Sequence, residues 1–102
     1  MAEFEREVQI AERFIQAFVT TNLEVKIEDK WQTSILRRYF DIVIYKGIHP
    51  IAVIEVKNRL SNKNYLAIAT DQVRSAISIT NARFGIVTDA ENYYFYDRNE
   101  KD

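Results

Sequence analysis

The sequence predicts a mixed α/β domain: a helix, three strands, a second helix and two further strands, with helices on the faces of the sheet. Three observations support this fold class. An amphipathic segment with helical spacing comes first, β-branched and aromatic runs separated by turn residues follow, and a second helical segment divides the third run from the fourth. Strands joined by short turns run antiparallel, whereas a helical crossover joins parallel strands, so the sheet should be mixed.

The first helix is expected over residues 3–19, and "TTN" at 20–22 ends it. The segment "LEVKIE" (23–28) alternates apolar and polar residues, which is typical of a half-buried strand, and "YFDIVIY" (39–45) is a β-branched and aromatic strand. The apolar positions that recur at helical spacing in the first segment are Phe4, Val8, Ala11, Phe14, Ile15, Phe18 and Val19.

The remaining elements follow a turn, "KGIHP" (46–50), in which Gly47 and Pro50 interrupt regular structure. "IAVIEVK" (51–57) is apolar on both faces and is therefore expected at the centre of the sheet. Residues 65–80 form the second predicted helix. Two strands, 83–89 and 92–97, complete the order.

Composition limits the classes of protein to consider. A chain of 102 residues suits a single domain over 1–102, and 47% hydrophobic with 28% charged residues is a globular composition. The absence of cysteine fits a cytoplasmic protein, and one histidine excludes multi-histidine metal sites. The acidic N-terminus is unlike a signal peptide, and no apolar run reaches the roughly 20 residues of a membrane span, so no membrane association is expected.

Charge is unevenly distributed along the chain, although the net charge is only −1. Residues 1–29 contain seven acidic and three basic residues, and residues 65–102 contain six acidic and four basic residues. The middle segment, 30–64, contains seven basic residues and two acidic ones, Asp41 and Glu55, both within apolar runs. Carboxylates inside strand-like runs are not explained by a solvated face, and they indicate a site.

Asp41, Glu55 and Lys57 could meet on one face of the sheet. Alternation places Glu55 and Lys57 on the same side of their strand, and a hairpin turning at 46–50 sets Asp41 roughly opposite Glu55. Adjacent carboxylates repel unless a cation lies between them, and an all-oxygen donor set suits Mg²⁺ or Mn²⁺. A lysine beside such a metal can hold a water or stabilise a phosphoryl transition state. A surface ion pair at the end of an edge strand is the simpler alternative.

The segments "FDIVIY" and "PIAVIEVKN" resemble the motifs of the PD-(D/E)XK nuclease superfamily, and in particular the N-terminal nuclease domain of type I restriction motor subunits and their small stand-alone relatives. The resemblance covers most of the chain and implies a restriction-endonuclease-like fold. The first motif, Pro-Asp in the family, is here Phe40-Asp41, and the second is Glu55-Val56-Lys57. The glutamine of the family's helix corresponds to Gln72, but the tyrosine that often follows it is replaced by Ala76.

The resemblance implies roles for these residues. Asp41, Glu55 and the carbonyl of Val56 would coordinate the metal, Lys57 would position the attacking water, and Gln72 would orient the lysine or the phosphate. Many members add a glutamate from the first helix, for which two candidates are open. Glu7 falls inside the apolar stripe of the helix and Glu12 falls at its edge, so helical geometry favours Glu7 as a further ligand.

Two functions from different classes follow. The first is a Mg²⁺-dependent DNA endonuclease, and the second is a binding or scaffold module on the same fold without catalysis; an unrelated interaction protein is a weaker third possibility. Four basic residues could contact DNA phosphates, although each could also be merely solvated. The aromatic strand 92–97 is apolar on both faces and predicts a homodimer that uses this strand or an adjoining helix. The four basic residues are Arg37, Arg38, Arg59 and Lys63.

Overall fold

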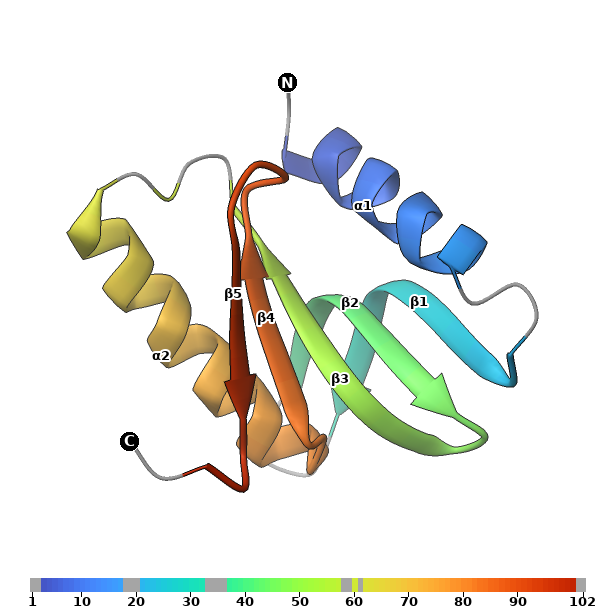
Figure 1. Ribbon diagram of the computed structural model, residues 1–102. Helices are drawn as coiled ribbons and strands as arrows, with labels where there is room; N and C mark the ends of the chain where they lie inside the picture. Colours follow the sequence, from blue (N-terminus) through green and yellow to red (C-terminus); the bar gives the residue numbers. More distant parts are fainter. Residues whose placement is uncertain (1–2, 18–20, 33–36, 58–59, 61, 101–102) are drawn as a thin grey trace.

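The structure is a computed structural model that describes residues 3–17, 21–32, 37–57, 60 and 62–100 (Figure 1). It confirms the predicted α/β class, with a five-stranded mixed sheet and two helices. The elements are α1 (Glu3–Ala17), β1 (Leu23–Gln32), β2 (Arg37–Lys46), β3 (His49–Val56), α2 (Lys63–Thr80), β4 (Phe84–Thr88) and β5 (Tyr93–Asp97).

The strands follow their sequence order across the sheet, β1-β2-β3-β4-β5. β3 pairs antiparallel with β2 and parallel with β4, so the prediction that this strand is central is confirmed. The first strand extends to Gln32, four residues beyond its predicted end, because β1 continues to pair with β2 as far as Gln32 and Arg37. Residues 18 and 19, expected in the first helix, lie outside the described residues.

The helices pack on opposite sides of the sheet (Figure 1). On one side, Ile10 and Ala11 of α1 pack with Ile42, Ile54 and other residues of β2, β3 and β4. On the other side α2 contributes its buried stripe, which consists of Ala69, Val73, Ala76, Ile77 and Thr80. Neither described helix is long and apolar enough to cross a lipid bilayer.

Gly85 allows α2 to lie close against β4. A Cβ atom at this position would come within 2.6 Å of Ile77 Cδ1 and 2.9 Å of Val73 Cγ2. These distances are shorter than van der Waals contact, so the close packing of helix on strand requires a residue without a side chain.

The alternation of side chains breaks where Glu28 and Asp41 lie. Ile27 pairs with Ile42, and both belong to the core under α1, whereas Phe40 belongs to the core under α2. Regular alternation would put Phe40 and Ile42 on the same face. Glu28 has a φ of 52°, a left-handed conformation that changes the direction of β1 at this point. The side chains of β1 and β2 therefore switch from one face of the sheet to the other at Glu28 and Asp41.

Candidate metal centre

Asp41 lies between β2 and β3, at the point where the two strands stop pairing. The last backbone pair in their register is Ile42 with Ile54. Beyond it, the Val56 N–H donates to Asp41 Oδ2 at 2.8 Å. A side-chain carboxylate thus replaces the strand partner of this N–H, and this hydrogen bond fixes the carboxylate beside the end of β3.

Glu55 and Lys57 approach Asp41 from β3. The Glu55 side chain is buried and hydrogen-bonds with the Asp41 carboxyl, and the Lys57 ammonium is close enough to stabilise the ionised form of Asp41. The backbone after Glu55 is held by β4, where Val56 pairs with Thr88 and the Lys57 N–H donates to the Thr88 carbonyl at 2.9 Å. The structure therefore brings Asp41, Glu55 and Lys57 together.

Helix α1 brings Glu7 to the same place. Glu7 is buried, with 4% of its surface exposed, whereas Glu12 is exposed to solvent. The neighbouring Arg6 donates from Nη1 to the Lys57 carbonyl at 3.2 Å, which links the first turn of the helix to the end of β3. Helical geometry favoured Glu7 over Glu12 as the residue at the site, and the burial of Glu7 agrees with that prediction.

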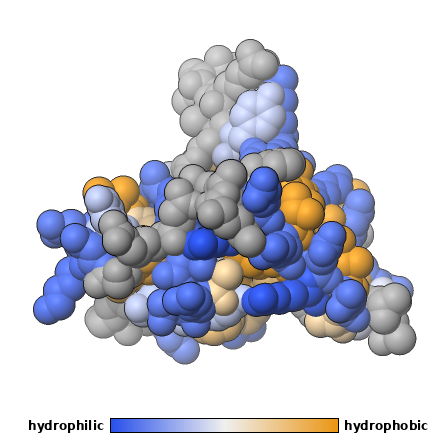
Figure 2. Space-filling view, turned by 90° about the horizontal axis from the view of Figure 1, so that it is seen from above, coloured by the Kyte–Doolittle hydropathy of each residue, from blue (hydrophilic) through white to orange (hydrophobic). Residues whose placement is uncertain are grey.

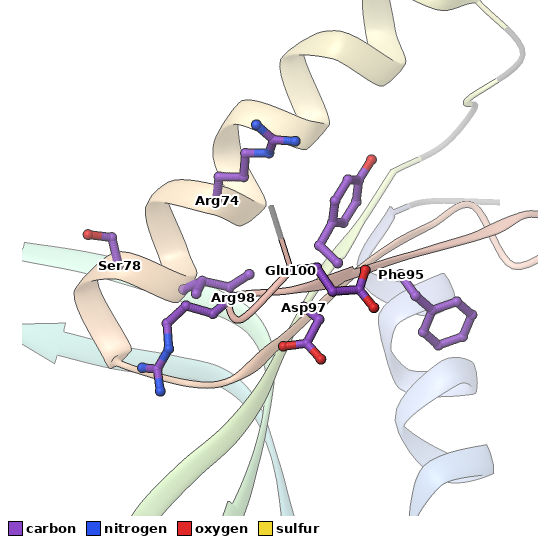
Figure 3. A pocket seen from close by; sticks show the side chains of 8 residues that line it. Arg74, Ser78, Phe95, Asp97, Arg98 and Glu100 are labelled. Atoms are coloured by element: carbon purple, nitrogen blue, oxygen red, sulfur yellow. The ribbon is translucent and has the colours of Figure 1, made fainter. Parts of the chain in front are cut away.

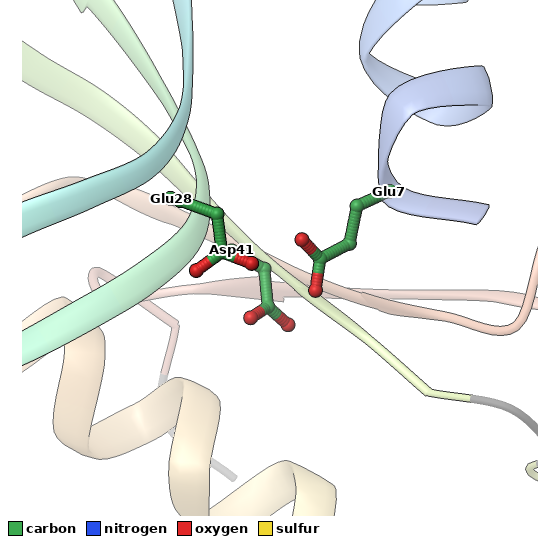
Figure 4. Close-up of side chains that lie close together, drawn as sticks. All are labelled: Glu7, Glu28 and Asp41. Carbon is green, nitrogen blue, oxygen red and sulfur yellow. The ribbon is translucent and has the colours of Figure 1, made fainter. Parts of the chain in front are cut away.

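Glu28 is the fourth acidic residue of the centre and is not among the residues predicted from the sequence. One carboxylate oxygen each from Glu7, Glu28 and Asp41 lie within 4.8 Å of one another (Figure 4). The paired residues on either side, Ile27 with Ile42 and Asp29 with Phe40, place Glu28 opposite Asp41. The predicted strand ends at residue 28, so the sequence pattern gives no signal that Glu28 lies opposite Asp41.

Two carboxyls of the cluster, Glu7 and Asp41, have raised pKa values. Burial, together with the hydrogen bond to Glu28 and the charge of Asp41, raises the pKa of Glu7 to about 9. Burial also raises the pKa of Asp41, although the Val56 N–H and the Lys57 charge oppose that shift. Like charges and desolvation therefore disfavour ionisation of both acids.

A divalent cation fits this donor set. Glu7 Oε2 is buried, and no described residue donates a hydrogen bond to it. A buried carboxylate oxygen without a donor is costly, and a cation would compensate it. The donors are all oxygen atoms, which suits Mg²⁺ or Mn²⁺ rather than a soft metal.

The other residues expected at the site are placed as follows. Gln72 is half-buried on α2, where it lines a shallow pocket with Ile68, Asp71 and Ser75. Lys63 is exposed at the first residue of α2. Arg59 and the side chains of Arg37 and Arg38 lie outside the described part of the chain.

A separate cavity of about 370 Å³ lies between α2 and the end of β5 (Figure 3). Residues from both elements and from the segment after β5 line it, including Arg74, Phe95 and Arg98. None of the four carboxylates of the centre lines it.

Seen from the end of the molecule where α1 and the β4–β5 turn lie, the described surface is largely hydrophilic, with hydrophobic residues in smaller groups (Figure 2).

Comparison with known proteins gives one family match. Residues 6–102 match the model described as the type I restriction enzyme R protein N terminus. No curated protein sequence shows significant similarity to the chain. The match includes every residue of the centre and all elements except the first residues of α1. The chain therefore belongs to the family of type I restriction enzyme R protein N-terminal domains.

Proposed function

We propose that this domain is a metal-dependent endonuclease that hydrolyses phosphodiester bonds in DNA. The family points to a nuclease domain related to restriction enzymes and implies DNA as a partner. The observation that supports catalysis most strongly is the position of Asp41. Its carboxylate accepts the Val56 N–H at 2.8 Å and meets Glu55, Glu7 and Glu28 beside a lysine.

Asp41, Glu55, Glu7 and the Val56 carbonyl are the proposed ligands of Mg²⁺ or Mn²⁺. When bound, the cation would supply Lewis-acid stabilisation of the phosphate and would lower the pKa of a water. Asp41 is already held in place by the Val56 N–H, so little reorganisation is needed on binding.

Lys57 is the proposed residue that positions the attacking water and stabilises the charge that develops on the phosphate. Its ammonium lies close enough to Asp41 to lower the pKa of that carboxyl, and the contact of its carbonyl with Arg6 fixes its backbone. A positioned cation of this kind typically contributes about 10²–10³ in rate. Gln72, on α2, is the residue proposed to orient Lys57 or the phosphate.

DNA would be held through its phosphates. Arg37, Arg38, Arg59 and Lys63 are the proposed contacts, all within the basic middle segment of the chain. Phosphate contacts position a duplex without reading its bases, so we expect little sequence preference.

We further propose that the domain acts as a homodimer through β5. Among the residues that the structure describes, this strand pairs with β4 alone and forms an edge of the sheet. It contains neither lysine nor proline, the residues that commonly protect an edge strand, and Phe95 is 73% exposed. Two copies would supply the two active sites that cleavage of both DNA strands requires.

The test is incubation of the purified protein with supercoiled, linear and branched DNA in Mg²⁺, in Mn²⁺ and in excess chelator. The proposal predicts cleavage that requires the cation and is lost in Asp41→Asn. Binding of DNA without cleavage of any of these substrates in either cation would instead support the non-catalytic binding module.

A further inference from the structure

We propose that Glu28, on β1, is a direct ligand of the divalent cation. The inference rests on the proposed metal centre and deepens it. It adds a ligand from β1, and none of the ligands inferred from the sequence lies on that strand. The cation would then be held by carboxylates from α1, β1, β2 and β3. The expected consequence is a tighter site than Asp41, Glu55 and Glu7 would form without Glu28.

The geometry of the cluster supports this role. Oxygens of Glu7, Glu28 and Asp41 lie within 4.8 Å of one another, a spacing that lets all three reach one ion. The Glu7 side chain extends from the helix toward the carboxylates of Glu28 and Asp41, which lie side by side (Figure 4). They come from a helix and two strands, so the convergence is produced by the tertiary fold.

An independent observation indicates that the cluster is made for a ligand. Only 4% of the Glu7 surface is exposed, and its Oε2 receives no hydrogen bond from any described residue. An acid in that position loses its hydration without gaining a donor. A cation between Glu7, Glu28 and Asp41 would compensate this oxygen and the repulsion among the three carboxylates.

Glu24 shows what an ordinary acidic residue on this strand looks like. Glu24 and Glu28 are both exposed residues of β1, and each is opposite a residue of β2. Glu24 pairs with Tyr45 and lies outside the cluster, whereas Glu28 has a φ of 52° and lies opposite Asp41. Glu24 is therefore a matched control of the same residue type on the same strand.

The experiment is calorimetric titration of Mn²⁺ into the full chain without DNA. We compare wild type, Glu28→Gln and Glu24→Gln, with far-UV circular dichroism and thermal unfolding in chelator as checks of folding. Glu28→Asn is a second variant, because asparagine tolerates a positive φ while it removes the charge. We expect Kd to rise at least tenfold in both Glu28 variants and to stay within twofold of wild type in Glu24→Gln.

The outcomes separate this inference from the proposed function. If wild type binds Mn²⁺ and a folded Glu28 variant binds it equally well, Glu28 is not a ligand, while the remaining metal centre stands. If wild type binds no Mn²⁺, the proposed metal centre is wrong and the inference fails with it. Equal weakening in Glu24→Gln would indicate a general effect of charge and would also overturn the assignment.

Discussion

Replacement of Glu7 by glutamine should stabilise the metal-free protein and weaken its stabilisation by divalent cations. Glu7 is buried beside Glu28 and Asp41, and burial with these neighbours raises its pKa to about 9 from an ordinary 4.5. Glutamine has nearly the same shape, carries no titrating proton and can donate from its amide to a neighbouring carboxylate. It therefore removes the repulsion but keeps the packing of α1.

The size of the effect follows from proton linkage. Between pH 4.5 and about 9 the folded state holds the Glu7 proton and the unfolded state does not, so the free energy of unfolding falls as pH rises. Each pH unit costs up to about 1.4 kcal/mol, which amounts to at most about 3 kcal/mol by pH 7. Glu28 is exposed, so solvent screens part of this interaction, and we expect roughly 1–2 kcal/mol for the substitution.

The assay is urea unfolding of wild type and Glu7→Gln in chelator at pH 4, 7 and 9, repeated at pH 7 with Mn²⁺. The gain in stability of the variant should be near zero at pH 4 and should grow with pH. Mn²⁺ should raise the stability of wild type more than that of the variant. Glu12→Gln, an exposed residue of the same helix, is the control and should change neither quantity. A Glu7→Gln protein less stable than wild type at pH 7 in chelator would mean that the buried Glu7 carboxyl does not destabilise the metal-free fold.

Four further outcomes are expected. Lys57→Ala should keep Mn²⁺ affinity by calorimetry but lose about 10²–10³ in cleavage rate, and unchanged cleavage would exclude a catalytic role. Glu28→Gly should raise the stability of the metal-free protein by about 1 kcal/mol in urea unfolding, because glycine accepts a φ of 52° without strain. Gly85→Val should cost about 1–3 kcal/mol in the same assay, because its side chain meets α2. Phe95→Lys should give a monomer by light scattering, whereas Ile48→Lys, at another exposed position, should leave the dimer intact.

Much of the fold could be predicted from the sequence because its elements carry strong local patterns. The strand at 51–57 is apolar on both faces, which only a central position satisfies, and the structure places β3 there. The predicted turn is confirmed at Gly47, whose φ is 62°, and an irregularity between Ile44 and Tyr45 then shifts the register by one residue and sets Ile42 opposite Ile54. Local patterns therefore located Asp41 and Glu55 only approximately opposite each other, and the register shift completes their approach.

Glu28 could not be recognised in the same way, because its position depends on the path of the whole hairpin. By alternation Glu28 should point outward from its strand, as Glu24 and Lys26 do. Its approach to Asp41 comes from the left-handed backbone at residue 28 and from the change of face between Phe40 and Ile42. Neither feature leaves a signature in residue type, since glycine or asparagine would be the usual choice at a positive φ.

The most direct test of the metal centre is an anomalous diffraction measurement on crystals grown with Mn²⁺. We expect an anomalous peak in direct contact with the carboxylate oxygens of Asp41, with Glu7 and Glu28 on its other sides, and no such peak in Asp41→Asn. Crystals of the wild-type protein that show no peak at Asp41 at saturating Mn²⁺, or show it only at unrelated surface carboxylates, would mean that these residues do not form a metal centre.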